Sequence, residues 1–392
     1  MVSTGTHASP AGAHVSPHEQ TEARAWLGRT EEGFHRAAAL LIGCCADRMR
    51  EDYRICRGPA ADGPVRALLT APATAFAIAD LHMWMGETFV VMGRKDGRAP
   101  WRQIVDLPSA VERISRIVEL AAVAVRGEGT ITVPQIPYSL PGLDVCVDEG
   151  HGELHLTRSV DGWRSAQGVL RRLETFQLYG STVLVDGDVP WITEPALMVR
   201  GGSVYGTRLS TVNWVWGAAL REAADLIERA LRDEGKMIAD FAHTLVPVEV
   251  DGCVFNSWVN TVVPGAIYVT RIQRPFVLAE LIVHEAAHIW LSEMDYVTRT
   301  TNEMHTDVRL DSPPRGHDRP AYAVLQDVVA HAWVSRFWRR LRESGTGAHS
   351  FLARMRCEQV DKLVSDGVQS LEQVREAISP YGWKLIELSR AA

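Results

Sequence analysis

Apolar residues recur every three or four positions along residues 276–295 and mark one side of a helix. These positions are Val277, Leu278, Leu281, Ile282 and Ile289. His284, Glu285 and His288 continue the same side. The pattern therefore predicts an amphipathic helix whose buried side carries three ionisable residues.

The same periodicity predicts helices elsewhere in the chain. They cover a segment from Thr30 onward, residues 65–86, 108–125 and 214–233, a segment from Asp318 to a stop at Gly345, and residues 350–388. Asp318 and Pro320 are the expected cap and first turn of the segment that stops at Gly345. The first third of the chain is therefore expected to be mostly helical.

Alternating and β-branched residues predict strands in the middle of the chain. These strands cover residues 130–133, 143–147, 154–157, 182–185, 246–250, 253–263 and 264–270, and a helix is expected over 164–175. Asp161-Gly162 and Asp186-Gly187 are typical of hairpin turns. Together the patterns predict an α+β fold, mostly helical with a mixed β-sheet, with a zincin-like strand and helix in the C-terminal half.

The strand 264–270 comes just before the helix 276–295 and has two interpretations. At the exposed edge of a sheet, it would pair with an extended peptide through backbone hydrogen bonds. As an inner strand, it would only support the helix. The sequence leaves both interpretations open.

A chain of 392 residues exceeds one ordinary domain, so we expect one large domain or two that pack closely. Residues 1–25, rich in Ser, Thr, Gly, Ala and His, are expected to be a disordered tail. Residues 26–205 form a helical and β region that is a candidate for peptide binding. Residues 206–392 form the domain that contains the 276–295 helix.

Charge and hydropathy narrow the classes of partner. The net charge is −7 and no basic cluster stands out, so the sequence indicates no positively charged surface that would bind nucleic acid or a membrane. Neither an apolar run of membrane-spanning length nor a secretory signal is present, so we expect a cytoplasmic protein. The six cysteines form no C-x-x-C pair that could build a zinc knuckle or redox centre.

The 276–295 helix contains the H-E-x-x-H motif His284-Glu285-Ala286-Ala287-His288. Histidines four residues apart on a helix lie one turn above each other, so both imidazoles reach one divalent metal ion, with Glu285 beside it as a proton acceptor. The alternative is a pair of core histidines bonded to backbone carbonyls. We favour the metal site because this combination of spacing and helical context is typical of one.

Two imidazoles need a third protein ligand to fix an ion. The extension H-x-x-G-x-x-H fails here, because Leu291 and Met294 stand where it requires Gly and His. His331 lies on the apolar side of the next helix and is the first candidate, although a lone buried histidine is also an ordinary core residue. The other candidates are Glu303, His305, Asp307, Gln326 and Asp327.

Two arginines precede the helix of His331 and suggest a cosubstrate. A guanidinium offers a planar fork of donors to a carboxylate, so Arg315 or Arg319 would hold an acidic cosubstrate if the loop brings it near the metal. Surface arginines near a helix start are the alternative interpretation.

The order of several motifs resembles one family. These motifs are Pro264-Gly265 with its strand, Leu281 to Trp290, Ser312-Pro313-Pro314-Arg315, Asp318-Arg319-Pro320, and Ala330-His331 to Arg339-Arg340. They resemble the HExxH-type peptide-modification proteins that accompany ribosomally made, post-translationally modified peptides in actinobacteria-like gene clusters. The resemblance covers mainly residues 214–341.

The resemblance implies an iron(II)- and 2-oxoglutarate-dependent peptide β-hydroxylase. His284 and His288 would then ligate iron, the next helix would supply the third ligand, and an arginine would bind 2-oxoglutarate. The chain has Gln326-Asp327 where the resemblance leads us to expect a histidine early in that helix. Either His331 is the ligand, or the metal site is altered or lost.

Three functions are therefore compatible with the sequence. The first is hydroxylation of a β-carbon of a ribosomal precursor peptide, with Glu285 orienting a ligand or a water molecule. The second is a zinc peptidase, with Glu285 as general base. The third is a non-catalytic accessory that binds the peptide for another enzyme. The oligomeric state is left open, with a homodimer among the options.

Overall fold

The computed structural model describes mainly the second half of the chain. The described residues are 123, 126–134, 138–139, 145–147, 153–165, 170–185, 199–200, 203–204, 207–209, 214–250, 255–259, 265–302, 308–311, 318–344 and 348–391. The helices expected from Thr30, over 65–86 and over most of 108–125, the tail 1–25 and the turn Asp186-Gly187 lie outside these residues. The described residues form an α+β fold with a mixed sheet, as the sequence predicts.

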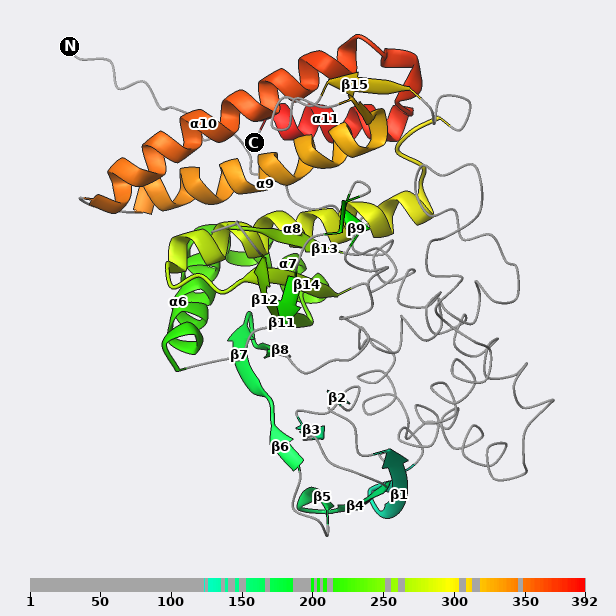
Figure 1. Cartoon of the computed structure of the whole chain (residues 1–392). Coiled ribbons are helices and arrows are strands. Elements are labelled where there is room, and N and C mark those ends of the chain that lie inside the picture. The colour runs from blue at the N-terminus through cyan, green and yellow to red at the C-terminus, as the bar shows by residue number, and fades with distance from the viewer. Residues whose placement is uncertain are drawn as a thin grey trace, which may run out of the picture.

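A six-stranded mixed sheet lies under the helical layers (Figure 1). Its main path runs β13-β14-β12-β8-β7, and β11 also pairs with β12. The strands are β7 (Glu174–Leu178), β8 (Ser181–Val185), β11 (Thr207–Leu209), β12 (Thr244–Val250), β13 (Ser257–Val259) and β14 (Ala266–Thr270). β12 runs parallel to β8 and to β14, whereas β13 runs antiparallel to β14. Strands from both sides of position 205 therefore share one sheet.

β14 is an inner strand, which decides between the two interpretations that the sequence left open. It lies between β12 and β13, and every residue from Ala266 to Thr270 is buried. A backbone bonded on both sides has no donors or acceptors left for a peptide. Within the described sheet, β13 takes the outer position next to β14.

Smaller antiparallel sheets precede this sheet along the chain. β1 (Gly129–Pro134), β4 (Glu153–Ser159) and β5 (Gly162–Ser165) form one, and β2 (Tyr138–Ser139), β3 (Val145–Val147) and β6 (Leu170–Arg172) form another. β9 (Val199–Arg200) pairs with β10 (Ser203–Val204). The turn expected at Asp161-Gly162 joins β4 to β5, with Gly162 at a φ of 113°.

The helix expected over 164–175 is wrong, because its described residues are strands. They belong to β5, β6 and β7, which pair with β4, β3 and β8. In β7, Phe176 and Leu178 are buried while Gln177 between them is exposed, which is the period of two of a strand. Pairing with β8 thus outweighs the helical preference of the preceding Leu and Arg residues.

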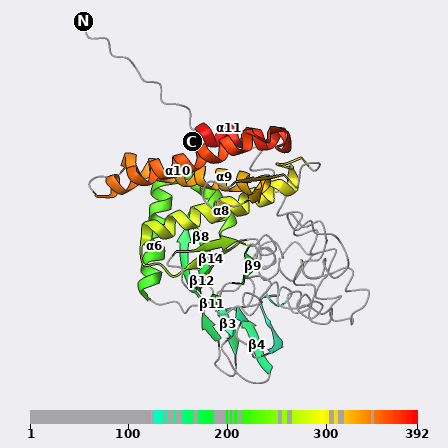
Figure 2. The ribbon, with the colours of Figure 1, turned by 45° about the horizontal axis from the view of Figure 1, so that its top comes forward.

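Helices cover the sheet in successive layers, as Figures 1 and 2 show. The helices are α6 (Trp214–Leu231), the 3-10 helix η4 (Arg232–Gly235), α7 (Lys236–Phe241), α8 (Pro275–Val297), α9 (Ala321–Ser344), α10 (Ala348–Glu372), the 3-10 helix η6 (Arg375–Ala377) and α11 (Pro380–Ala391). α8 packs on β13 and β14, α9 packs on α8, and α10 and α11 pack on α9. One buried apolar cluster runs through these layers, from Phe176 to Ile386.

α9 begins later than the sequence suggests. Asp318–Pro320 forms the short strand β16, which pairs with β15 (Arg309–Asp311), so Asp318 is not the helix cap. Proline has no backbone N–H, which is tolerated at the end of a short edge strand before a helix. No helix in the described ranges is long and apolar enough to cross a membrane.

Candidate functional site

α8 brings the two motif histidines toward α9. The helix starts with Pro275 at its first turn, where the missing N–H costs nothing, and its core residues Ile282, Val283, Ala286 and Ala287 are almost fully buried. His284 and His288 stay partly exposed, whereas Glu285 is only 4% exposed. The packing of α8 therefore leaves both imidazoles partly exposed and buries the carboxylate of Glu285.

Three imidazoles meet between α8 and α9, and we call His284, His288 and His331 the histidine cluster. The Nε2 atoms of His284 and His288 are 3.0 Å apart. The ring centres are 4.6 Å apart for His284 and His288, and 5.0 Å apart for His284 and His331. The structure thus brings the first candidate for a third ligand next to the motif.

The orientation of His331 is fixed by its own helix. Its Nδ1 donates a hydrogen bond of 2.6 Å to the backbone carbonyl of Asp327, one turn earlier on α9. A proton on Nδ1 leaves the lone pair on Nε2, which is the usual arrangement of a metal-ligating imidazole. Burial also lowers the pKa of His331 and so favours its neutral form, which is the one that binds metal.

The spacing of the cluster fits a metal ion in part. Two imidazole nitrogens about 2.1 Å from one ion lie about 3.0 Å apart at a right angle and about 3.4 Å apart at a tetrahedral angle. The 3.0 Å between the Nε2 atoms of His284 and His288 is the length of a hydrogen bond between the two rings, so both nitrogens lie within reach of one ion but their distance does not select a coordination geometry. Within the described ranges, however, no three His, Cys, Asp or Glu side chains stand ready to hold one ion together. A bound ion would therefore require the three imidazoles to stand closer together than they do here.

Glu285 points to the sheet rather than lying open to solvent. Ser257 of β13 donates a hydrogen bond of 2.6 Å from its Oγ to Glu285 Oε1, and both residues are buried. Because β13 is the outer strand next to β14, this bond places the motif carboxylate directly beside that strand. A carboxylate held in this way can orient a neighbouring group without taking a proton.

Arg319 contacts the cluster through Asp327. Its Nη1 forms an ion pair with Asp327 Oδ2, whose side chain is 7% exposed, while the backbone carbonyl of Asp327 holds His331. Asp327 thus stands between Arg319 and the cluster, and Arg319 contacts the helix that carries His331. Arg315 lies outside the described residues, as do Glu303, His305 and Asp307.

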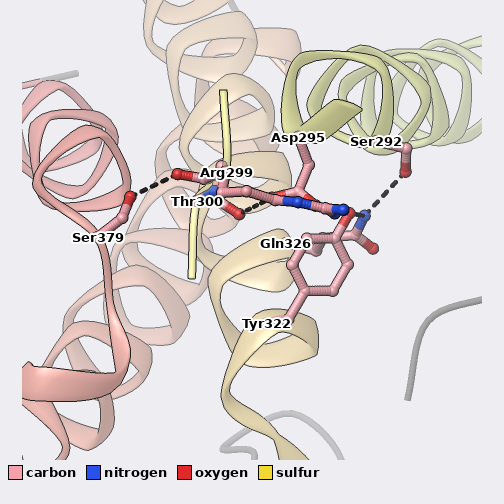
Figure 3. Close-up of polar contacts among 7 residues, drawn as sticks. All are labelled: Ser292, Asp295, Arg299, Thr300, Tyr322, Gln326 and Ser379. Atoms are coloured by element: carbon pink, nitrogen blue, oxygen red, sulfur yellow. Dashed lines mark hydrogen bonds and ion pairs between the residues drawn. The ribbon is translucent and has the colours of Figure 1, made fainter. Parts of the chain in front are cut away.

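Gln326 belongs to a polar layer that joins α8 to α9 beyond the cluster, as Figure 3 shows. Its Nε2 donates to Ser292 Oγ at 2.9 Å and to Tyr322 Oη at 2.6 Å. Ser292 in turn donates to the carbonyl of His288. The amide of Gln326 therefore braces the two helices, and Asp327 is committed to Arg319, so His331 is the better third ligand.

The same figure shows how the end of α8 is fixed to α11. Asp295 accepts hydrogen bonds from the backbone and the hydroxyl of Thr300, and Ser379 donates to the carbonyl of Arg299 at 2.6 Å. Ser379 also caps α11 by accepting from Gly382 N at 3.0 Å. Polar groups thus hold the end of α8 to the start of α11.

The sequence did not indicate an ion pair on the other side of the cluster. Glu280 of α8 binds Arg356 of α10 and accepts a hydrogen bond of 2.7 Å from Trp338 Nε1 of α9. Glu280 stands one turn before His284 on the predicted helix, and this spacing was the indication in the sequence that Glu280 lies near the site. Arg356 lies 76 positions away, so no local pattern pointed to the pair.

Comparisons with known proteins leave the family of this chain open. No protein-family model matches the chain, and a search of curated proteins found no similar one.

Proposed function

We propose that this protein is an iron(II)- and 2-oxoglutarate-dependent hydroxylase that acts in the cytoplasm on a β-carbon of a ribosomally made precursor peptide. The observation that supports it most is the histidine cluster, with two Nε2 atoms 3.0 Å apart and a third imidazole oriented by Asp327. His284, His288 and His331 would hold iron(II), and the bound ion would supply the oxidation of a C–H bond with a 2-oxo acid and O2; the usual ligands of such iron sites are two histidines and a carboxylate. The precursor peptide and the β-carbon come from the family resemblance alone.

The residues of the site have separate roles in this proposal. His284, His288 and His331 hold the ion, and Glu285, bonded to Ser257, keeps the motif helix and β13 in register. Arg319 is the candidate for the carboxylate of 2-oxoglutarate. A guanidinium offers a planar fork of donors to a carboxylate, and the side chain of Arg319 is 24% exposed. Arg315 stays a prediction from the sequence.

A zinc peptidase is the second candidate, and one contact favours it. Glu285 lies beside the outer strand β13, where an extended peptide would pair and where a general base would be needed. Against it stands the failure of the peptidase extension H-x-x-G-x-x-H, because Leu291 and Met294 stand where it requires Gly and His. We therefore place hydroxylation first.

The test starts with the metal and then follows the products. Purified protein is loaded with iron(II) under anaerobic conditions, and 2-oxoglutarate is added before O2 and a candidate peptide. Hydroxylation consumes one O2 and one 2-oxoglutarate per peptide, releases succinate and CO2, and adds one oxygen atom to the peptide mass. Two shorter peptides would instead support the peptidase. If the protein binds no metal, a non-catalytic peptide-binding accessory is the remaining function.

Two variants separate these outcomes. His284→Ala removes a ligand and should abolish binding of iron, so a variant that still holds stoichiometric iron contradicts the site. Glu285→Gln keeps an acceptor for Ser257 and should retain the metal. In a hydroxylase it should also retain most succinate release, whereas in a peptidase it should lose cleavage by a factor of about 100 or more.

A further inference from the structure

Glu280 and Arg356 form a forked ion pair between α8 and α10. Arg356 Nε lies 2.9 Å from Glu280 Oε2 and 3.1 Å from Oε1, and Arg356 Nη2 also contacts Oε1. The side chain of Arg356 is 33% exposed and that of Glu280 is 15% exposed, so the pair is partly shielded from water. Forked arginine–carboxylate pairs fix geometry as well as charge, because two parallel hydrogen bonds must align.

A third helix shares the same carboxylate. Trp338 of α9 donates its Nε1–H to Glu280 Oε2 at 2.7 Å, and its ring stacks on Phe276 of α8 with centres 6.0 Å apart. Trp338 stands two turns after His331 on α9, and Glu280 stands one turn before His284 on α8. The carboxylate of Glu280 therefore links the helices that carry the cluster to each other and to α10.

The pair lies close enough to the cluster to act on it. Glu280 stands four residues before His284 on α8, and Trp338, which donates to it, stands seven residues after His331 on α9, so this contact lies beside the cluster on both helices. The pair therefore acts on the cluster through the position of the helices.

Position matters at this site because the tolerance of a metal site is small. A rotation of α8 by about 10° moves a side-chain tip about 5 Å from the helix axis by roughly 1 Å. Metal–ligand distances vary by only about 0.2 Å. A contact that fixes the rotation of α8 against α9 therefore decides whether His284 and His331 reach one ion.

We propose that Glu280 and Arg356 are positioning residues of the histidine cluster, which hold α8 so that His284 faces His331. This inference rests on the proposed metal site. It assigns a role to a pair of charges that touches none of the reacting groups and that the motif does not contain.

The test measures cobalt(II) binding by the apoprotein, followed through the visible absorption of the bound ion. Glu280→Gln keeps an acceptor for Trp338 but loses the ion pair with Arg356. It should weaken cobalt(II) binding by about 10- to 100-fold, the usual cost of losing a partner that orients a ligand. Arg356→Lys keeps the charge without the fork and should weaken binding less than Glu280→Gln does.

Asp361→Asn is the matched control. Asp361 pairs with Arg339 between α10 and α9, with side chains 39% and 35% exposed, but this pair includes no residue of α8. The control should bind cobalt(II) as the unaltered protein does, and all variants should show the same far-UV circular dichroism.

The outcomes separate this inference from the proposed function. If the unaltered protein binds no cobalt(II), the proposed metal site fails and this inference fails with it. If that protein binds the ion and Glu280→Gln binds it equally well, only the positioning role is overturned. An equal loss in Asp361→Asn also overturns it, because helix packing in general would then explain the effect. If Glu280→Gln does not fold, Arg356→Lys decides, and unchanged binding there refutes the role.

Discussion

The hydrogen bond from Ser257 to Glu285 is the contact that joins the outer strand to the motif helix, and Ser257→Ala tests it. The bond is 2.6 Å long, and its partners are 7% and 4% exposed. A hydrogen bond to a charged group contributes about 1.5–3 kcal/mol, and a buried acceptor left without its donor adds to the cost. We therefore expect Ser257→Ala to lower the free energy of unfolding by about 2 kcal/mol.

Urea unfolding followed by both tryptophan fluorescence and circular dichroism measures this loss, and coincident curves justify a two-state treatment. Ser370→Ala is the matched control. Its hydroxyl donates to the carbonyl of Asp366 at 3.1 Å near the surface of α10, so its removal should cost under about 0.5 kcal/mol.

A double-mutant cycle of Ser257→Ala with Glu285→Ala isolates the pair from the other contacts of each residue. We expect a coupling free energy of about 1–2 kcal/mol between them, since the bond is buried and charge-assisted. A coupling below about 0.5 kcal/mol would refute the reasoning, because Glu285 would then be held by other groups and β13 would not be tied to the motif.

Three further predictions concern the surroundings of the cluster. Burial lowers the pKa of His331 below its usual 6.5, so the unfolded chain binds more protons as the pH falls from about 6.5 to the lower folded pKa. The unfolding free energy should decrease over that window, and urea unfolding at several pH values should show a smaller decrease for His331→Gln. Arg319→Leu leaves the buried carboxylate of Asp327 without its ion-pair partner and should lower the free energy of unfolding in urea by about 3 kcal/mol. The double variant Arg319→Leu with Asp327→Leu removes both charges and should regain most of that loss. Gly382→Ala places a Cβ 2.2 Å from the carbonyl oxygen of Thr300 and should destabilise the protein by about 1–3 kcal/mol in the same assay, so an unchanged midpoint would contradict this close approach.

Local patterns sufficed for elements whose residues satisfy their own periodicity. The helix 276–295 appears as α8, and 214–233 appears as α6 followed by a 3-10 turn. The strand 182–185 appears as β8 and 246–250 lies within β12. In each of these elements the spacing of apolar residues can be read from the sequence. The same spacing determines which side of the element is buried.

The errors arose where partners distant in sequence decide the structure. The segment 164–175 forms strands because β3, β4 and β8 pair with it. For the strand 264–270 the sequence left an edge and an inner position open, and β14 takes the inner one because the short strand β13, of which only Ser257–Val259 is described, covers its outer side. Sheet order depends on such pairings, and no local period contains them.

The histidine cluster shows the same limit in the candidate site. His284 and His288 followed from one helical turn, but the place of His331 depends on how α8 and α9 are aligned. The contacts show an antiparallel alignment: Glu280 meets Trp338, His284 meets His331, and Ser292 meets Gln326. One parameter, the register of the two helices, therefore fixes all three contacts. A shift of one turn, about 5.4 Å along the axis, would break the three together. The ion pair below the cluster and the polar layer above it thus determine which imidazole stands beside the motif.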